Sequence, residues 1–304
     1  MKVLGILKGL FQKSLKRVQG SALPLPYKPK FEDSGRNQMK YVIDHDLHIH
    51  SGLSLCSNHP EQTAENILKY AAEMGFHKIC LTDHFWDSAV DGASEWYRAQ
   101  DLEHISKALP LPTAEGITFD FGCETDLDRL MTLGISKETM DQLAFVIVPT
   151  SHLHMSGFTI DSDVTSVKAR AKLYMERNHA LMDMKLPFEK MGLAHFTCPL
   201  LARNSEGSHN DIINAISDAS FAELFERVAA SGMGVELNMP LIDCSSEEIL
   251  RPYRIARACG CTFYLGSDAH TPKSFIGARK KFEAFTEALG LTEDDKFAYA
   301  QKGN

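Results

Sequence analysis

The sequence predicts an α/β fold in which parallel strands form a barrel and helices cover its outside. From residue 41 onward, short apolar segments alternate with longer amphipathic segments, which is the pattern of repeated strand–helix units. The 304 residues suffice for one barrel domain, and no long structureless segment interrupts the alternation. We find seven strand candidates, one fewer than the eight of the common barrel, so an eighth strand could be hidden.

Each strand candidate is a short apolar run. The candidates are Tyr41 to His48, Lys78 to Thr82, Ile117 to Gly122, Ala144 to Thr150, Gly192 to His195, Gly234 to Asn238 and Thr262 to Gly266. The clearest helix candidate is Thr63 to Met74, because Ile67, Leu68 and Ala71 lie on one apolar stripe and Gly75 follows as a stop. Further helix candidates are Val167 to Met184, Asp211 to Ala230, Glu247 to Ala258 and Ile276 to Ala288.

The first 40 residues are predicted to form an amphipathic helix and a linker in front of a barrel domain of residues 41–304. Residues 20–40 are rich in Pro, Lys and polar groups, which is typical of a linker. We expect the helix to dock on its own protein, and the alternative is a helix that lies on a membrane surface. The apolar residues at helical spacing are Val3, Ile6, Leu7, Leu10, Phe11, Leu15 and Val18.

Composition favours a cytoplasmic protein. The N-terminal segment lacks a long apolar block and a small-residue cleavage site, so no secretory signal is expected. No stretch reaches the roughly 18 apolar residues of a membrane span. The seven cysteines are an odd number, and several lie in or beside apolar runs, as expected of reduced thiols.

Charge narrows the classes of partner. The chain has 32 Lys and Arg against 40 Asp and Glu, a formal net charge of -8. A field of this sign repels nucleic acid and anionic membranes, so no nucleic-acid partner is expected. It also opposes a small phosphate ester, unless bound cations reverse the sign locally.

Metal-binding residue types follow nearly every strand candidate. The first ends in DHDLHIH, and strand alternation places His48 and His50 on the same side. In a parallel barrel the later strand ends meet at the same rim, where such folds carry their functional groups. Neutral imidazole suits Zn, Mn and Fe, and carboxylates can bridge two cations. The later donors are Asp83, His84, Glu124, His152, His154, His195, Asp268 and His270.

This order of motifs resembles the PHP family, named for polymerase and histidinol phosphatase domains. The resemblance rests on DLHIHS at 46–51, TDH at 82–84, Glu124 after the third strand and SDAH at 267–270. It extends from about residue 43 to about residue 275 and leaves out the N-terminal segment. It implies a distorted TIM-like (β/α)7 barrel that holds two or three divalent metal ions.

The resemblance also implies a distribution of ligands. His48, His50, Glu124 and Asp268 would hold one metal ion, with Glu124 bridging to a second ion held by His152 and His195. His84 and His270 would hold a third ion. His154 is the alternative to His152. Family members often carry His or Asp where this chain has Cys56, so the third ion is expected either to bind this thiolate, to bind weakly or to be absent.

The implied activity is hydrolysis of a small phosphate monoester, similar to histidinol phosphate, by a metal-bridging hydroxide. A cationic side chain would stabilise the charge of the transition state, and Arg203 is the first candidate, followed by Arg98. His209 is either a proton donor to the leaving oxygen or an ordinary surface histidine.

Four further polar residues are expected around the ligands. Asp46 and Asp83 lie close in sequence to proposed ligands and are expected to orient imidazoles. Glu236 and Asn238 end a strand and either line the pocket or form an internal hydrogen-bond network.

Three other functions fit parts of the pattern. Amidohydrolase barrels also open with HxH and close with a metal-binding Asp, but they usually have a strand-end lysine where this chain has Glu124. A nuclease of the PHP class is disfavoured by the acidic balance. A degenerate barrel that binds metal without turnover is favoured only by Cys56.

Overall fold

The computed structural model describes residues 39–239 and 246–299. The predicted N-terminal helix and linker, apart from residues 39 and 40, lie outside the described residues. None of the helices in the described ranges combines the length and apolar character needed to cross a membrane.

The described strands are all parallel and form two sheets, ordered β1-β2-β4 and β3-β5-β6-β7-β8-β9. Their bounds are β1 (His45–Ile49), β2 (Lys78–Leu81), β3 (His84–Phe85), β4 (Thr118–Phe121), β5 (Cys123–Thr125), β6 (Val146–Val148), β7 (Met191–Leu193), β8 (Gly234–Asn238) and β9 (Phe263–Gly266). Each of the seven strand candidates contains or overlaps a strand, and the predicted α/β fold with parallel strands is confirmed.

Hydrogen bonds join the two sheets. Only Thr82 and Asp83 separate β2 from β3, and only Gly122 separates β4 from β5, so each pair continues one path through the fold. At the other edge, β1 meets the end of β9: the Asp268 N–H donates to the His48 carbonyl at 2.8 Å, and the His50 N–H donates to the Ala269 carbonyl at 3.1 Å. The sheets therefore form one distorted ring of strands.

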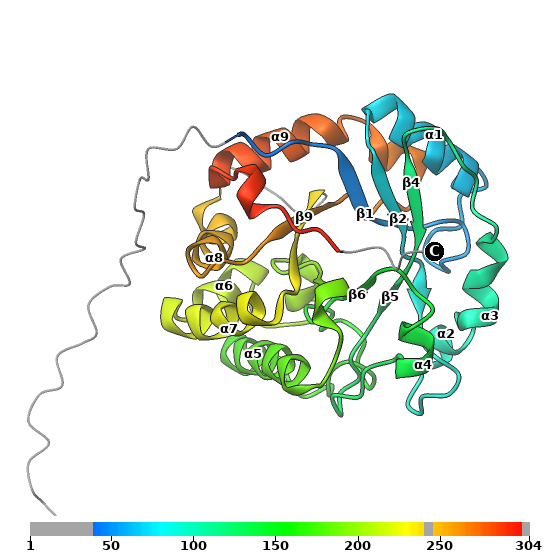
Figure 1. Ribbon diagram of the computed structural model, residues 1–304. Coiled ribbons are helices and arrows are strands. Elements are labelled where there is room, and N and C mark those ends of the chain that lie inside the picture. The colour runs from blue at the N-terminus through cyan, green and yellow to red at the C-terminus, as the bar shows by residue number, and fades with distance from the viewer. Residues whose placement is uncertain (1–38, 240–245, 300–304) are drawn as a thin grey trace, which may run out of the picture.

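Helices surround this ring (Figure 1). Their bounds are α1 (Ala64–Met74), α2 (Glu95–Arg98), α3 (Leu102–Ile105), α4 (Lys137–Met140), α5 (Val167–Asp183), α6 (His209–Asn214), α7 (Asp218–Ser231), α8 (Glu247–Ala258) and α9 (Ala278–Leu289). Short 3-10 turns are η1 (Ser106–Ala108), η2 (Phe188–Lys190), η3 (Pro199–Ala202), η5 (Pro272–Phe275) and η6 (Glu293–Asp295).

Local sequence explains where the helices begin and end. The Thr63 side chain accepts a hydrogen bond from the Asn66 N–H at the start of α1, and Gly75 ends the helix in the left-handed conformation, with φ of 69°. The single helix predicted over Asp211 to Ala230 is wrong: Ser217 starts a new helix by capping the Ser220 N–H, so the segment is divided into α6 and α7.

An apolar layer fills one end of the ring and leaves the other end to the polar strand termini. Leu47, Ile147 and Tyr264 pack in one buried cluster. Phe297 and Tyr299 after η6 belong to the same cluster, so the C-terminal segment covers this end. The carboxyl ends of the strands lie opposite and carry the polar side chains described next.

Candidate metal centre

The end of β1 places two imidazoles side by side. His48 and His50 are fully buried, and their Nε2 atoms lie 3.0 Å apart. This is the arrangement that strand alternation predicted, although the pairing of β1 with β2 shifts register between Asp46 and Ile49. Two nitrogens at this distance can bind one cation without moving far.

Glu124, on β5, lies at the middle of the histidines. Its Oε2 atom is 3.1 Å from both His50 Nε2 and His84 Nδ1. Its Oε1 atom faces the other side, 3.7 Å from His195 Nε2 and 4.0 Å from His152 Nε2. One carboxylate therefore reaches two groups of imidazoles, which is the position of a bridging ligand.

Asp268 follows β9 and completes the cluster. Its Oδ1 atom is 3.3 Å from His50 Nε2, and its Oδ2 atom is 3.4 Å from His195 Nε2. Asp268 and His195 both have left-handed backbone conformations, with φ of 50° and 52°. Such conformations are costly for residues other than glycine and are concentrated at functional sites.

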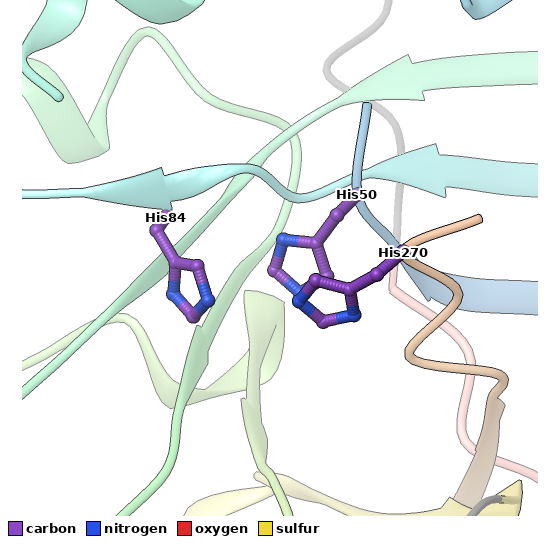
Figure 2. Close-up of side chains that lie close together, drawn as sticks. All are labelled: His50, His84 and His270. Carbon is purple, nitrogen blue, oxygen red and sulfur yellow. The ribbon is translucent and has the colours of Figure 1, made fainter. Parts of the chain in front are cut away.

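Three sets of ligand atoms are close enough to hold a cation, with the atoms of each set within 4.8 Å of one another. The sets are His50, His84 and His270; His48, His50 and Asp268; and His48, Glu124 and His195. Figure 2 shows the first set: the three rings come from separate chain segments and gather in one space. The His50 ring stacks on His270 and His84 at centroid distances of 4.2 and 4.5 Å.

Several buried nitrogen and oxygen atoms of this cluster, all of types that bind metals, have no hydrogen-bond partner among the described residues. They are both carboxylate oxygens of Glu124, His84 Nδ1, His195 Nε2 and Asp268 Oδ1. A buried polar atom without a partner costs free energy, so their convergence needs a compensating group. Divalent cations fit this donor set of imidazole nitrogens and carboxylate oxygens.

Electrostatics keep the two carboxylates in the ionised form of metal ligands, but they raise the pKa values of His48, His50 and His152 above the usual histidine value. Burial would raise the pKa values of Glu124 and Asp268, but the surrounding histidines hold both well below their usual range. Burial keeps the pKa of His84 well below its usual value. For His50, burial lowers the pKa, but Asp268 and Glu124 outweigh it and raise the value to about 9. Cation binding would therefore displace a proton from His50.

Hydrogen bonds on the far sides of the rings fix their orientation. Glu236 lies 2.5 Å from Nδ1 of His48, and its other oxygen accepts from the His195 N–H at 2.8 Å. The Asp126 Oδ2 atom is 2.8 Å from Nδ1 of His152. These contacts turn the Nε2 atoms of both rings toward the centre, as outer partners of metal-binding histidines do.

The expected roles of Asp46 and Asp83 need correction. Among the described residues, Asp46 accepts hydrogen bonds from the backbone N–H groups of Ser267 and His48 and from the Tyr70 hydroxyl, not from an imidazole. Asp83 instead accepts hydrogen bonds from Ser51 and Ser54. Both carboxylates hold the loops that carry ligands, so their effect on the imidazoles is indirect.

Sequence reasoning missed two partners of the rings. Ser54 Oγ lies 3.1 Å from Nδ1 of His50, and Asp126 contacts His152. Asp126 follows Glu124 by two residues, and the same-side rule that related His48 to His50 could have marked it. Glu236 and Asn238 follow the second of their two expected interpretations, because Asn238 donates to Glu236 at 3.3 Å inside the network.

The structure separates His152 from His154. Nε2 of His152 is 3.0 Å from Nδ1 of His195, inside the cluster. His154 lies at the wall of the adjoining cavity, and burial together with the nearby His152 and Arg203 charges lowers its pKa to about 3. Cys56 is an exposed residue that lines the cavity but belongs to none of the three ligand sets found among the described residues.

A cavity of about 840 Å³ opens onto the cluster. His84, His152, His195, Asp268 and His270 form part of its lining. Arg203 lines the same cavity, whereas Arg98 lines a separate, smaller one. His209 is the first residue of α6 and is not among the described residues that line the cavity, so the geometry does not support it as a proton donor.

Comparisons with known proteins agree with this architecture. A family model for the PHP domain matches residues 46–240, well over half of the chain. The crystal structure of histidinol phosphate phosphatase (HisK) from Lactococcus lactis subsp. lactis Il1403, complexed with Zn, L-histidinol and phosphate, has a TM-score of 0.55 at 15% sequence identity. That match covers 84% of this chain and 98% of HisK. A comparison with curated protein sequences gave no match.

Two further solved structures are less similar, each with a TM-score of 0.31. They are archaeal ribonuclease P with mature tRNA, at 13% identity over 80% of this chain and 90% of that chain, and a triazine hydrolase variant, at 11% over 75% and 59%. The likeness to HisK supports the predicted distorted TIM-like barrel, and the PHP model accounts for the order of motifs along the chain. The chain therefore belongs to the PHP family.

Proposed function

We propose that this protein is a metal-dependent phosphatase that hydrolyses a small phosphate monoester. The observation that carries the proposal is the convergence of unpartnered buried donor atoms on one space beside a large cavity. HisK was crystallised as a complex with Zn, L-histidinol and phosphate, which supports the same class of reaction for a similar fold. Histidinol phosphate and related monoesters are the first substrates to test.

The ligands are proposed as follows. His48, His50, Glu124 and Asp268 hold one cation, and Glu124 extends to a second with His152 and His195. His84 and His270 hold a third cation. His50 lies close enough to bind either the first or the third cation. Zn, Mn and Fe all suit these donors. Bound cations supply the positive charge that the net charge of -8 lacks, and they lower the pKa of water in the site.

In the proposed reaction, the oxygen of water adds to phosphorus and the bond between phosphorus and the alcohol oxygen breaks. The alcohol leaves with one proton, and orthophosphate is the other product. Arg203 is exposed and lines the cavity, and a guanidinium can donate to two phosphate oxygens at once. We assign it to the phosphate group.

The test combines elemental analysis with phosphate release. Protein purified without chelators should contain two or three divalent ions per chain and release orthophosphate from small monoesters. The Asp268→Asn variant should lose most of its bound metal and most of its phosphate release, and the exposed Asp161→Asn variant should retain its metal and its activity. A chain that holds its full metal complement but releases no phosphate from any monoester would contradict the proposal.

A further inference from the structure

The loop between β1 and α1, residues 51–62, contacts every chain segment that carries a member of the three-histidine set. That set is His50, His84 and His270, which Figure 2 shows together. The three histidines come from the end of β1, the start of β3 and the loop after β9. None of the residues 51–62 belongs to a ligand set found among the described residues. The 51–62 loop can therefore act on these histidines only by fixing where they lie.

Gln62 joins two of these segments through one buried amide. Its side chain is only 2% exposed, and its Nε2 atom donates to the His50 carbonyl at 2.7 Å and to the Ala269 carbonyl at 3.2 Å. An amide nitrogen has two protons, so one side chain can donate to both carbonyls. The His50 N–H donates to the same Ala269 carbonyl at 3.1 Å. Gln62 therefore lies where β1 meets the end of β9, and it ties the main chain of His50 to the residue next to His270.

Ser57 holds the main chain of His270 itself. Its side chain is buried, and its hydroxyl donates to the His270 carbonyl at 2.7 Å. Ser57 and Gln62 thus donate to three carbonyls on the two segments that present His50 and His270. Both residues act on the main chain, so their effect on the imidazoles is one of placement.

Ser54, in the same loop, orients the other contacts of the set. Its hydroxyl donates its single proton to Asp83 Oδ1 at 2.7 Å, so it can only accept from its two other neighbours. These are the His84 N–H and Nδ1 of His50, both at 3.1 Å. Because Nδ1 of His50 is used as a donor here, Nε2 is the nitrogen that remains for a cation.

The 51–62 loop is itself held in place. The Gly52 N–H donates to the Gln62 carbonyl at 2.7 Å, which closes the loop at its base. The Leu55 N–H donates to Oε1 of the fully buried Gln100 at 2.9 Å, and His104 on α3 donates to a further carbonyl of the loop at 2.8 Å. The loop is therefore a fixed frame, so its donors resist a shift of the carbonyls that they hold.

Metal binding is sensitive to such a shift. A zinc–nitrogen bond is about 2.0–2.1 Å long, and ligands must be held within about 0.5 Å of the binding geometry. The ligands proposed for the second cation depend on other partners, because Asp126 orients the His152 ring and Glu236 accepts from the His195 N–H. A fault in the 51–62 loop should therefore affect some cations and not others.

We infer that Gln62 and Ser57 are positioning residues for the cation proposed at the three-histidine set. The inference rests on the metal ions of the proposed function. The juxtaposition that carries it is one fixed loop whose buried donors reach three carbonyls on the segments that present His50 and His270. Loss of either donor lowers the affinity for this cation and leaves the affinity for the cation at His152 and His195 unchanged.

The test measures zinc affinities of the full chain by competition with a chromophoric chelator. Ser57→Ala should lower the affinity for one cation about tenfold, the lower end of what outer partners of metal ligands contribute. Ser57→Thr, which keeps a hydroxyl, should bring the affinity back toward the parent value. Asn58→Ala, at the exposed neighbouring position in the same loop, is the matched control and should keep every affinity.

Gln62→Met is the second variant, because methionine keeps the length of the side chain and removes the donor. It should lower the affinity for one or both of the cations that His50 can bind, again about tenfold, and spare the cation at His152 and His195. Urea unfolding of the metal-free variants separates placement from stability. A residue that matters only for stability would lower the unfolding midpoint without favouring one cation over another.

The outcomes separate this inference from the proposed function. Unchanged affinities in both Ser57→Ala and Gln62→Met, or an equal loss for every cation, would overturn the positioning role and leave the phosphatase proposal standing. The expected loss of affinity in a parent chain that releases no phosphate from any monoester would overturn the phosphatase proposal alone. A parent chain that binds no zinc would overturn both.

Discussion

Asp126 and His152 form a buried pair, with Oδ2 of the carboxylate 2.8 Å from Nδ1 of the imidazole. Burial lowers the pKa of His152, but Asp126 outweighs it and raises the pKa above its usual value. The same carboxylate accepts from Tyr97 and from Arg177 on α5. The position of a proposed metal ligand thus depends on a helix outside the ring of strands.

Replacing Asp126 by Asn should weaken the proposed cation site of His152 and His195. The amide carries no charge and holds the imidazole less firmly, and outer partners of this kind typically contribute about 10- to 100-fold in metal affinity. Chelator competition should show a reduced affinity for one cation. The affinity for the cation proposed at His50, His84 and His270 should stay unchanged. The control is Asp161→Asn, at an exposed carboxylate. Unchanged affinity for every cation would disprove the role of Asp126.

Arg177 should be among the most sensitive positions for stability. Its side chain is fully buried and donates to the carbonyls of Thr150, Leu127, Asp128 and Thr159 as well as to Asp126. Arg177→Met removes a buried hydrogen-bond donor from four carbonyls and the cation beside the buried Asp126 carboxylate, so the free energy of unfolding should fall by about 3–5 kcal/mol. Urea denaturation measures it.

A matched control lies on the same helix. Lys172 is exposed on α5, and its ion pair with Glu176 at 2.9 Å is a surface contact. Lys172→Met should change the free energy of unfolding by less than about 1 kcal/mol. If the Arg177 and Lys172 variants proved equally stable, the buried network would contribute far less than its geometry implies.

The donors at the strand ends could be predicted because residue type and strand alternation are local properties. His48 and His50 follow from one strand, and Glu124 and Asp268 follow from the rule that parallel strand ends meet at one rim. The structure brings these residues together. Their metal-binding role remains a prediction.

Contacts between distant segments could not be read in the same way. Arg177 and Asp126 are 51 residues apart, and nothing in either segment marks the pair. The serine that divides Asp211 to Ala230 into two helices acts through a cap, and the apolar pattern continues on both sides of it. The break between β2 and β3 at Thr82 and Asp83 and the break between β4 and β5 at Gly122 likewise depend on the curvature of the whole ring.

Asp44 gives a prediction for pH dependence. It lies 2.8 Å from Nδ1 of His45 and 3.1 Å from Nζ of Lys296, and so joins the start of β1 to the C-terminal segment. Burial raises its pKa, but His45 and Lys296 outweigh this and lower the value from 3.8 to about 2. A carboxylate with a lowered folded-state pKa stabilises the fold above about pH 4, and this contribution disappears as the pH falls toward 2.

The Asp44→Asn variant should therefore be less stable than the parent at pH 7 by about 1 kcal/mol, a value reduced for the partial exposure of the carboxylate. Urea denaturation from pH 7 to pH 3 should show the difference shrinking below pH 4. A constant difference across this range would show that the substitution acts by something other than charge.

Gly122 links the backbone geometry of the ring to the candidate site. It separates β4 from β5, and its N–H donates to the Leu81 carbonyl at 2.8 Å. A Cβ atom at this position would lie 2.2 Å from the Phe145 carbonyl oxygen and 2.9 Å from Cys80 Sγ. The carbonyl belongs to a neighbouring backbone and cannot turn away, so the strands would have to move apart.

Gly122→Ala should accordingly destabilise the fold by about 3 kcal/mol, at the upper end of what overpacking costs. Because Glu124 follows two residues later on β5, the same displacement should also reduce metal content measured by elemental analysis. Gly52→Ala is the matched control, since its Cβ would meet nothing closer than 3.5 Å and its φ is not positive. Equal thermal midpoints for the two variants would mean that the strands yield at Gly122, and that the break between β4 and β5 does not hold Glu124 in place.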